Sequence, residues 1–492
     1  MRSSFFVNGS EAHHESAVAV ETPSLAHIEQ MLARLLSQQE PVHFETTPAA
    51  LGVKTLIALD KLHTVTDFTG EAATDEAVLD SEQQAALARC STDTEVVKFL
   101  TPVLWRLRMS SSNCDDPCRP VLVNSENCAW LDNLAAPLRP NMRLKPDLFV
   151  APHVCIEEQT GTPSQGFGSC FLFGRLANSR LQRDGCVREV YEAKLADLTT
   201  AHFGELIMYH RLIPDECRGM LFNRSQFWLF ATYGGYPLRL VRSEWIAPGS
   251  ATIVRGFFEN NAPPPPQLML VLRHLLSALD LRQAPVDGTA FLGAGGSGRV
   301  FAVRRAESPE RLALKVVAAG TRTLWMHDLT TEYNALTVAA QRGAPVVPVV
   351  AGSLCLAGHD GGGFLLAHCG VPFDATASLA ACTAAFAALA ALHDCAIVHG
   401  DARLPNLLLI DGKAVWIDMA AGLLEGPASR FLKPYCSGDA ELLAQSVLLS
   451  VGIPALPASV ATAVACYDFA APETVQALAA AVWVAVVGSR VT

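Results

Sequence analysis

The segment that decides the fold is VHGDARLPNLLLIDGKAVWIDMA, residues 398–420. It contains two short apolar runs, residues 407–410 and 414–417, which are joined by Asp411-Gly412-Lys413. An Asp-Gly pair between two apolar runs is a strong signal for a tight turn. The segment therefore predicts a β-hairpin with one polar residue at its entrance and another at its exit.

The polar residues at the two ends of this hairpin are Asn406 and Asp418, and Asp401 lies on the loop just before them. Because a hairpin brings its two ends to the same mouth, we expect these three oxygen-bearing side chains to converge. Carboxylate and amide oxygens suit a hard cation such as Mg²⁺ together with a phosphate group.

A glycine-rich stretch, FLGAGGSGRVFAV, occupies residues 291–303 upstream of the hairpin. It carries Gly293, Gly295 and Gly298 in a G-x-G-x-x-G pattern. Glycines let a backbone approach phosphates closely. A dinucleotide-binding fold would begin a helix directly after the glycines, whereas residues 299–304 alternate like a strand. We therefore expect a hairpin that covers phosphates.

Other elements with chemical meaning lie between the glycines and the first segment. Lys315 ends the predicted strand LALK, and residues 330–340 predict a helix whose Glu332 is available to pair with that lysine. Residues 362–370 predict a buried strand. Residues 378–394 predict an alanine-rich core helix, because they are apolar nearly all round.

In this order, the motifs resemble the protein-kinase-like superfamily over about residues 288–492. The resemblance implies a bilobal domain that transfers a phosphoryl group from ATP with the help of Mg²⁺. It also implies individual roles: Gly293, Gly295, Gly298 and Val300 cover the phosphates, Lys315 binds them while held by Glu332, Asp401 is the catalytic base, and Asn406 and Asp418 ligate Mg²⁺.

The sequence also departs from the pattern of that family. Arg403 stands where Ser/Thr kinases usually carry a lysine that contacts the transferred phosphate, and a guanidinium is a planar fork rather than a point charge. Asp418-Met419-Ala420 replaces Asp-Phe-Gly, and the residue between His399 and Asp401 is glycine rather than arginine. Only residues 421–438 lie between the Asp418-Met419-Ala420 motif and Asp439. Asp439 resembles the aspartate that opens the next core helix in this family. The phosphate acceptor therefore stays open, as a protein or a small molecule.

A second group of chemically meaningful residues lies in the middle of the chain. Pro146-Asp147 opens a predicted strand, and VREVYEAKLA, residues 187–196, predicts another strand by its alternation. Glu192 and Lys194 are two residues apart, so they share a face of that strand. The carboxylates of Asp147 and Glu192 can hold a divalent cation, and Lys194 can polarise a water or stabilise a developing phosphorane charge.

These residues resemble the PD-(D/E)xK nuclease superfamily, with Glu95 on an upstream helix (94–108) and Glu205 and Tyr209 on a following helix (200–213). The resemblance implies a restriction-endonuclease-like α/β domain that binds DNA, with Asp147 and Glu192 as metal ligands and Lys194 as a catalytic residue. The gap between Asp147 and Glu192 is long, and Glu205 stands where a glutamine is more common. The alternative is an ordinary charge pair on a strand.

The chain is thus predicted to be an α+β multidomain protein. It divides into residues 1–89, an acidic, partly disordered segment with one amphipathic helix near 25–36; residues 90–259, the nuclease-like domain; residues 260–285, a proline-rich linker and helix; and residues 286–492, the kinase-like domain with a short C-terminal lobe. The proline run NNAPPPPQ marks the linker, because it cannot form a helix or a central strand.

Composition limits the class and the compartment of the protein. Half of the residues are hydrophobic and 17% are charged, which allows a sizeable core and excludes wholesale disorder. The net charge of −11 is concentrated in residues 1–89, so the middle segment is not barred from nucleic acid. The fourteen cysteines fit free thiols in a reducing compartment. The N-terminus lacks the apolar region of a signal peptide, and the longest apolar run, 477–488, is too short for a membrane span.

Three hypotheses follow for an intracellular protein of the cytoplasm or nucleus. The first is an ATP- and Mg²⁺-dependent phosphotransferase similar to Ser/Thr protein kinases. The second is a metal-dependent DNA nuclease whose kinase-like domain is regulatory or acts on a non-protein acceptor. The third keeps the kinase-like domain only as a nucleotide-binding scaffold. The combination of the two domains resembles Crinkler-type effectors.

Overall fold

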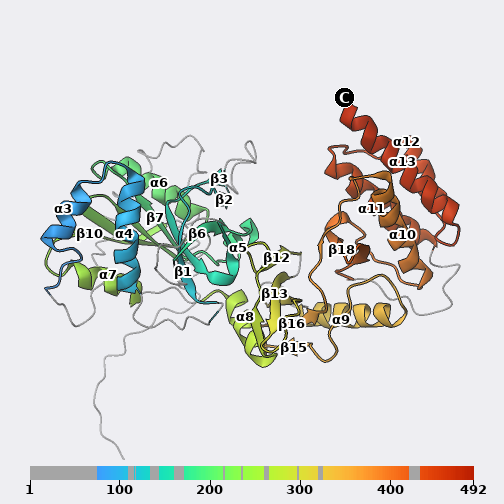
Figure 1. Ribbon diagram of the computed structural model, residues 1–492, viewed down its shortest axis with the longest axis horizontal. Helices are drawn as coiled ribbons and strands as arrows, with labels where there is room; N and C mark the ends of the chain where they lie inside the picture. Colours follow the sequence, from blue (N-terminus) through green and yellow to red (C-terminus); the bar gives the residue numbers. More distant parts are fainter. Residues whose placement is uncertain are drawn as a thin grey trace, which may run out of the picture. The chain divides into compact units, whose positions relative to one another are not determined.

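The structure is a computed structural model, and its helices and strands are labelled in Figure 1. It describes residues 75–108, 116, 118–132, 143–159, 171–213, 216–233, 236–259, 265–295, 298–319, 325–419 and 433–491. The predicted helix at 25–36 lies outside these residues.

An eight-stranded mixed sheet forms the middle of the chain, in the order β10-β9-β8-β7-β4-β1-β6-β5. Its strands are β1 (Pro120–Asn124), β4 (Leu148–Pro152), β5 (Ile156–Glu158), β6 (Phe171–Leu176), β7 (Glu189–Ala193), β8 (Glu216–Phe222), β9 (Gln226–Tyr233) and β10 (Tyr236–Glu244). β1 pairs antiparallel with β4, β4 pairs antiparallel with β7, and β7 pairs parallel with β8. A separate two-stranded sheet joins β2 (Leu131–Asp132) and β3 (Arg143–Leu144).

Helices cover both faces of the eight-stranded sheet. α4 (Asp93–Arg108) and α7 (Ser250–Glu259) share a core with the face of β7 that carries Tyr191, and α6 (Thr200–Arg211) shares a core with the face that carries Val190. β7 forms within residues 187–196, where the sequence predicts a strand, and all five of its residues are buried. Glu192 is buried among them and accepts a hydrogen bond from Lys194. The shorter helices of this region are α3 (Ser81–Ala88) and α5 (Ser179–Arg183).

A second sheet follows, in the order β11-β13-β14-β16-β15, with β12 paired to β13. Its strands are β11 (Leu281–Gln283), β12 (Phe291–Ala294), β13 (Arg299–Arg305), β14 (Leu312–Ala318), β15 (Cys355–Leu356) and β16 (Gly361–Leu366). The segment predicted as linker and helix contains α8 (Gln267–Ala278), which packs against β14 and β16. Its buried leucines join a single hydrophobic core with residues of both sheets, so the middle region and the second sheet are continuous.

α9 (Trp325–Gln341) packs against β14 and β16 of the second sheet. The C-terminal part is mainly helical, and α10 (Leu379–Asp394), α11 (Lys433–Ser450), α12 (Ala458–Ala465) and α13 (Pro472–Val491) lie together in Figure 1. It also holds a small sheet of β17 (Val371–Pro372), β18 (Leu407–Ile410) and β19 (Lys413–Trp416). The β18–β19 hairpin turns at Asp411 and Gly412, which have φ values of 49° and 76°, as the sequence predicts. α11 begins at Lys433, so Asp439 lies within the helix rather than at its start.

Helix α13 is longer than the apolar run 477–488 indicates. Among the described residues, it is the one helix long and apolar enough to cross a membrane, by length and composition. Leu478, Val482 and Val486 on this helix are fully buried in the helical core, whereas Val484 on another face is 70% exposed.

A buried charge cluster holds the middle of the eight-stranded sheet. Glu189 on β7 accepts hydrogen bonds from Arg108, whose Nη1 is 2.5 Å away, from Arg218 and from the Tyr191 hydroxyl. Arg218 is fully buried and also donates to the Phe257 carbonyl. Burial raises the pKa of Glu189, but the two arginines outweigh it and lower the pKa to about 2.

We therefore expect Glu189→Ala to lower the free energy of unfolding by about 3–5 kcal/mol, because it leaves two arginines without their carboxylate. Urea denaturation would measure the loss. Exposed Glu244 on β10 offers a matched control, and Glu244→Ala should unfold like the wild type. Since the folded pKa of Glu189 is depressed from 4.5, this contribution is present above pH 4.5 and is lost as the pH falls toward 2. Equal stability of the two variants would contradict the assignment.

Candidate functional site

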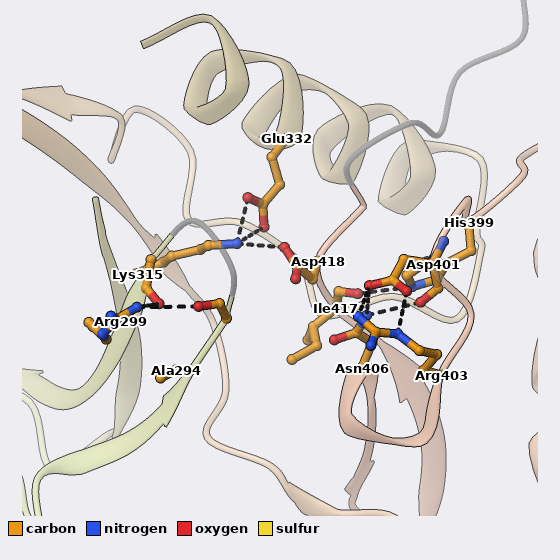
Figure 2. A network of polar contacts seen from close by, with 12 residues as sticks. Ala294, Arg299, Lys315, Glu332, His399, Asp401, Arg403, Asn406, Ile417 and Asp418 are labelled. Carbon is orange, nitrogen blue, oxygen red and sulfur yellow. Dashed lines mark hydrogen bonds and ion pairs between the residues drawn. The ribbon is translucent and has the colours of Figure 1, made fainter. Parts of the chain in front are cut away.

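Lys315 stands at the centre of a network that joins three elements (Figure 2). Its ammonium Nζ lies 2.6 Å from both carboxylate oxygens of Glu332 and 2.7 Å from Oδ1 of Asp418. Lys315 is on β14, Glu332 is on α9, and Asp418 follows β19. Burial lowers the pKa of Lys315, but the two carboxylates outweigh it and raise the pKa, so the lysine stays charged.

The glycine loop between β12 and β13 lies close to this network. Gly295 N–H donates to the Gly298 carbonyl across the loop at 3.0 Å. A Cβ added to Gly298 would lie 2.9 Å from the Val316 carbonyl oxygen, and one added to Gly295 would lie 3.5 Å from Oδ2 of Asp418. A Cβ on Gly293 would meet nothing within 4 Å, so close packing explains the glycine at Gly298 but not at Gly293.

The loop at residues 399–406 holds the second group of predicted residues (Figure 2). Arg403 forms a two-pronged ion pair with Asp401, with its Nη2 2.6 Å from Oδ2. Asn406 Nδ2 donates to the Asp401 carbonyl at 2.9 Å and to its carboxylate at 3.0 Å. The hydrogen bond from Arg403 is the main reason that the pKa of Asp401 lies below its usual range.

Asp439 on α11 holds this loop through hydrogen bonds to its backbone. Its carboxylate accepts from the backbone N–H of His399 at 2.6 Å and of Gly400 at 2.9 Å, and it lies 3.2 Å from Nε2 of His393. Burial lowers the pKa of His399, and its Nε2 lies 3.0 Å from the Ile417 carbonyl, where a neutral ring donates. His399 thus joins the loop to the end of the hairpin through a hydrogen bond.

A cavity lies between the glycine loop, the Lys315 network and Asn406. Its apolar lining comes from Leu292, Val300, Ala313, Leu366, Leu408 and Ile417, and its polar lining includes Lys315, Glu332, Asn406 and Asp418. An apolar slot suits a planar base, and a lysine with two oxygen-bearing side chains suits phosphates and Mg²⁺. The residues present therefore fit an Mg²⁺-nucleotide. Val300, which the sequence assigns to nucleotide contact, lies in this lining.

The predicted nuclease residues form a second cluster in the middle region. Asp147 Oδ2 accepts from the Ala193 N–H at 2.8 Å, which places it beside Glu192. Lys194 Nζ lies 2.7 Å from Oε1 of Glu192 and 3.1 Å from Oε2 of Glu205. Tyr209 donates to Glu205 at 3.2 Å. The β1–β4–β7 pairing and the α6 crossover bring these residues together.

The two carboxylates of this second cluster are difficult to ionise. Burial raises the pKa of Asp147 to about 6. Burial and the neighbouring Asp147 carboxylate raise the pKa of Glu192 to about 8. Lys194 lowers both pKa values without reversing either shift. Such a pair favours a bound cation, because the cation would offset the cost of two buried negative charges.

Sequence reasoning misplaced or missed some neighbours. Glu95 accepts from the N–H and the hydroxyl of Ser91 at the start of α4, so it caps the helix instead of joining Asp147. The other carboxylates that raise the pKa of Asp147 are Glu126 and Asp93. Glu126 is buried and accepts from Asn124 in the turn that follows β1, two residues away in the sequence.

Neither cluster supplies a complete set of protein ligands for a metal ion. In the part of the chain that the structure describes, no group of three or more His, Cys, Asp and Glu side chains could hold a metal ion. The predicted ligands are two pairs, Asn406 with Asp418 and Asp147 with Glu192. Mg²⁺ is commonly held by one or two carboxylates with waters and substrate phosphates completing its shell, so two protein ligands are consistent with that ion.

Comparison with known proteins gives protein kinase domains as structural neighbours. The kinase PK-1 of Cydia pomonella granulovirus is 15% identical, with a TM-score of 0.26, over 36% of this chain and 73% of that chain. The PknI kinase domain of Mycobacterium tuberculosis is 16% identical, with a TM-score of 0.28, over 41% of this chain and 94% of that chain. Neither a family model nor a curated protein matches the chain.

We expect Asp439→Asn to loosen the loop at 399–406, because an amide group cannot accept from both backbone N–H groups and its own N–H₂ would face a donor. Leaving a buried N–H unpaired costs about 1–3 kcal/mol. Hydrogen exchange of the His399 and Gly400 amides should therefore become faster. Glu441→Gln, an exposed change on the same helix, is the control, and equal exchange in both variants would refute the role of Asp439.

Proposed function

We propose that residues 286–492 form a phosphotransferase that uses ATP and Mg²⁺ and acts on a hydroxyl group, as Ser/Thr protein kinases do. The observation that carries this proposal is the contact of Lys315 with both Glu332 and Asp418 at the polar end of the cavity. A charged lysine held there by two carboxylates can bind phosphate oxygens. The glycine loop lies close enough to Asp418 to cover those phosphates.

Each remaining residue has a role in this proposal. Asn406 and Asp418 would hold Mg²⁺, which supplies charge neutralisation for the phosphates when bound. Asp401 would accept the proton of the acceptor hydroxyl, and its lowered pKa keeps it ionised for that task at neutral pH. Arg403, whose side chain is 55% exposed, can also contact the transferred group.

The acceptor is a protein or a small molecule. A hollow beside the loop at 399–406 is lined by Val398, Gly400, Tyr435, Glu441, Leu442 and Gln445, among others. Tyr435 there is 60% exposed. This hollow adjoins Asp401 along the chain, and a protein acceptor with a Ser or Thr hydroxyl is the partner we propose.

Transfer of labelled phosphate from ATP tests the proposal. Asp401→Ala and Asp418→Ala should each lower the rate at least about 100-fold, because they remove the base and a metal ligand. Asp394→Ala changes an exposed carboxylate on α10 and should retain the wild-type rate. Equal incorporation by all four proteins would reject a phosphotransferase that uses this site.

The pH dependence of the same reaction tests the role of Arg403. Removing the guanidinium in Arg403→Ala should raise the pKa of Asp401, since its hydrogen bond and charge hold that pKa low. The acidic limb of the kcat/KM profile should therefore move to higher pH. Arg403→Lys keeps the charge and should move the limb less, so an unshifted limb in the alanine variant would exclude Asp401 as the titrating base.

A second candidate function, a metal-dependent DNA nuclease, is favoured by the cluster of Asp147, Glu192 and Lys194. We infer that the two carboxylates would hold Mg²⁺ and that Lys194 would stabilise charge on the cleaved phosphate. The closeness of half-buried Asp147 to buried Glu192, both with raised pKa values, supports this inference. DNA would then be a partner of the middle region, and the kinase-like region would be regulatory or act on a non-protein acceptor.

Nicking of plasmid DNA in the presence of Mg²⁺ should be lost in Lys194→Ala and kept in Lys145→Ala, which changes an exposed lysine before β4. Because both carboxylates must lose protons to bind the cation, nicking should rise as the pH increases from 6 to 8. Nicking that is unchanged in Lys194→Ala would exclude this cluster as its source.

The proposed location is the cytoplasm or the nucleus of a cell, as in Crinkler-type effectors. The support is chemical: the cysteines that the structure describes are free thiols, and six of them are buried, namely Cys118, Cys155, Cys186, Cys217, Cys382 and Cys436. Free thiols are typical of a reducing compartment.

A further inference from the structure

Arg180 of the middle region donates hydrogen bonds to the backbone of the glycine loop. Arg180 lies on α5, in the connection between β6 and β7. Its Nη1 donates to the carbonyl oxygens of Ala294 and Gly295, at 2.8 Å each, across a sequence separation of 114 and 115 residues. The middle region thus contacts the backbone of the loop that would cover the phosphates.

An ion pair beside this contact joins the same two parts. Arg299, the first residue of β13, pairs with Asp184 through two hydrogen bonds of 2.6 and 2.7 Å. The two side chains are only 17% and 21% exposed. Arg299 Nη1 also donates to the carbonyls of Gly295 at 3.2 Å and Gly298 at 3.0 Å, and Figure 2 shows Arg299 beside the loop. A two-pronged, partly buried pair holds its geometry better than a single exposed contact.

The helix that supplies Arg180 is itself fixed in the middle region. Asn178 caps it by accepting from the Arg180 N–H at 2.8 Å. Gln182 is fully buried and donates to the Leu212 carbonyl at 2.6 Å, and Leu181 lies in the hydrophobic core. Arg180 and Asp184 therefore project from a rigid support, not from a free loop.

The contact lies on a continuous boundary. The Glu158 N–H at the end of β5 donates to the Gly288 carbonyl at 2.9 Å, and Glu157 forms a bridge with Thr289. A Cβ added to Gly288, which has a φ of 83°, would lie 3.1 Å from the Glu158 carbonyl oxygen. The backbone just before β12 is thus paired with the edge of the larger sheet.

These contacts have two consequences for a bound phosphate. Glycines lose more conformational entropy than other residues when a loop becomes ordered. If hydrogen bonds already hold the loop in place, nucleotide binding costs less of this entropy. The carbonyl oxygens of the loop would repel a phosphate, and Arg180 and Arg299 hold three of them in hydrogen bonds to positive charge. Both effects favour nucleotide binding.

We propose that Arg180 and Asp184 of the middle region are positioning residues of the nucleotide site, an inference that rests on the proposed phosphotransferase. They act through Ala294, Gly295 and Arg299 and do not touch the nucleotide. The chain runs from Asp184 directly into β7, which carries Glu192. By linkage, nucleotide binding stabilises the contact between the two regions as much as that contact favours the nucleotide.

The test uses the full chain and a non-hydrolysable ATP analogue with Mg²⁺, with affinity measured by calorimetry. Arg180→Ala and Asp184→Asn should each weaken binding about 5- to 10-fold, in the lower part of the range for coupling between sites. The KM for ATP should rise by a similar factor with kcat changed less than about twofold, as expected for lost binding rather than lost chemistry. Arg180→Lys, which keeps a donor and the charge, should recover part of the affinity.

The control is Arg183→Ala, an exposed residue on the same helix, which should bind the analogue like the wild type. A double-mutant cycle gives a second measurement: if Asp184 acts through Arg299, adding Asp184→Asn to Arg299→Gln should weaken binding no further. Wild-type affinity in both Arg180→Ala and Asp184→Asn, or fully additive losses in the cycle, would overturn the inference alone. Absence of nucleotide binding by the wild type would overturn the proposed function and this inference with it.

Discussion

The contact on which the candidate site depends is the buried pairing of Lys315 with Glu332 and Asp418. The lysine belongs to the second sheet, the glutamate to α9 and the aspartate to the end of the β18–β19 hairpin, so one ammonium group fixes three elements relative to each other. Two carboxylates around one buried cation keep that cation charged. The glycine loop, the apolar cavity and the loop at 399–406 are arranged around this charge.

The two clusters of the protein use the same residue types, and in both of them the pKa of the lysine and the pKa of a buried glutamate are raised. At Lys315 the lysine bonds two carboxylates from other elements, and its positive charge is stabilised. In the middle region half-buried Asp147 lies beside buried Glu192, and burial together with the neighbouring carboxylate raises the pKa of Glu192. Each cluster therefore holds more carboxylates than lysines, and a bound cation would offset that excess of negative charge at either place.

The two regions that the sequence separates by a proline run share a core in the structure. α8 packs against β14 and β16 of the second sheet, and its buried leucines belong to a hydrophobic core that also contains residues of the eight-stranded sheet. Arg180, Asp184 and Arg299 join the glycine loop to the middle region. The buried residues of α8 lie on one face of an amphipathic helix, so the helix belongs to the core and is more than a spacer. Two sites in one such unit can influence each other through the packing between them.

The sequence by itself determined the local parts of this protein. The hairpin at Asp411-Gly412, the glycine loop and the helices at 94–108 and 200–213 follow from turn chemistry and periodicity, which act over a few residues. The spacing of Asp401 and Asn406, five residues apart, also places them in contact. Only the tertiary structure decided the pairing of Lys315 with Asp418, which lies 103 residues away. The same holds for the hydrogen bonds from the loop at 399–406 to Asp439 and from Arg180 to the glycine loop. Arginines and carboxylates are common on protein surfaces, so such long-range pairs leave no pattern in the sequence until the chain has folded.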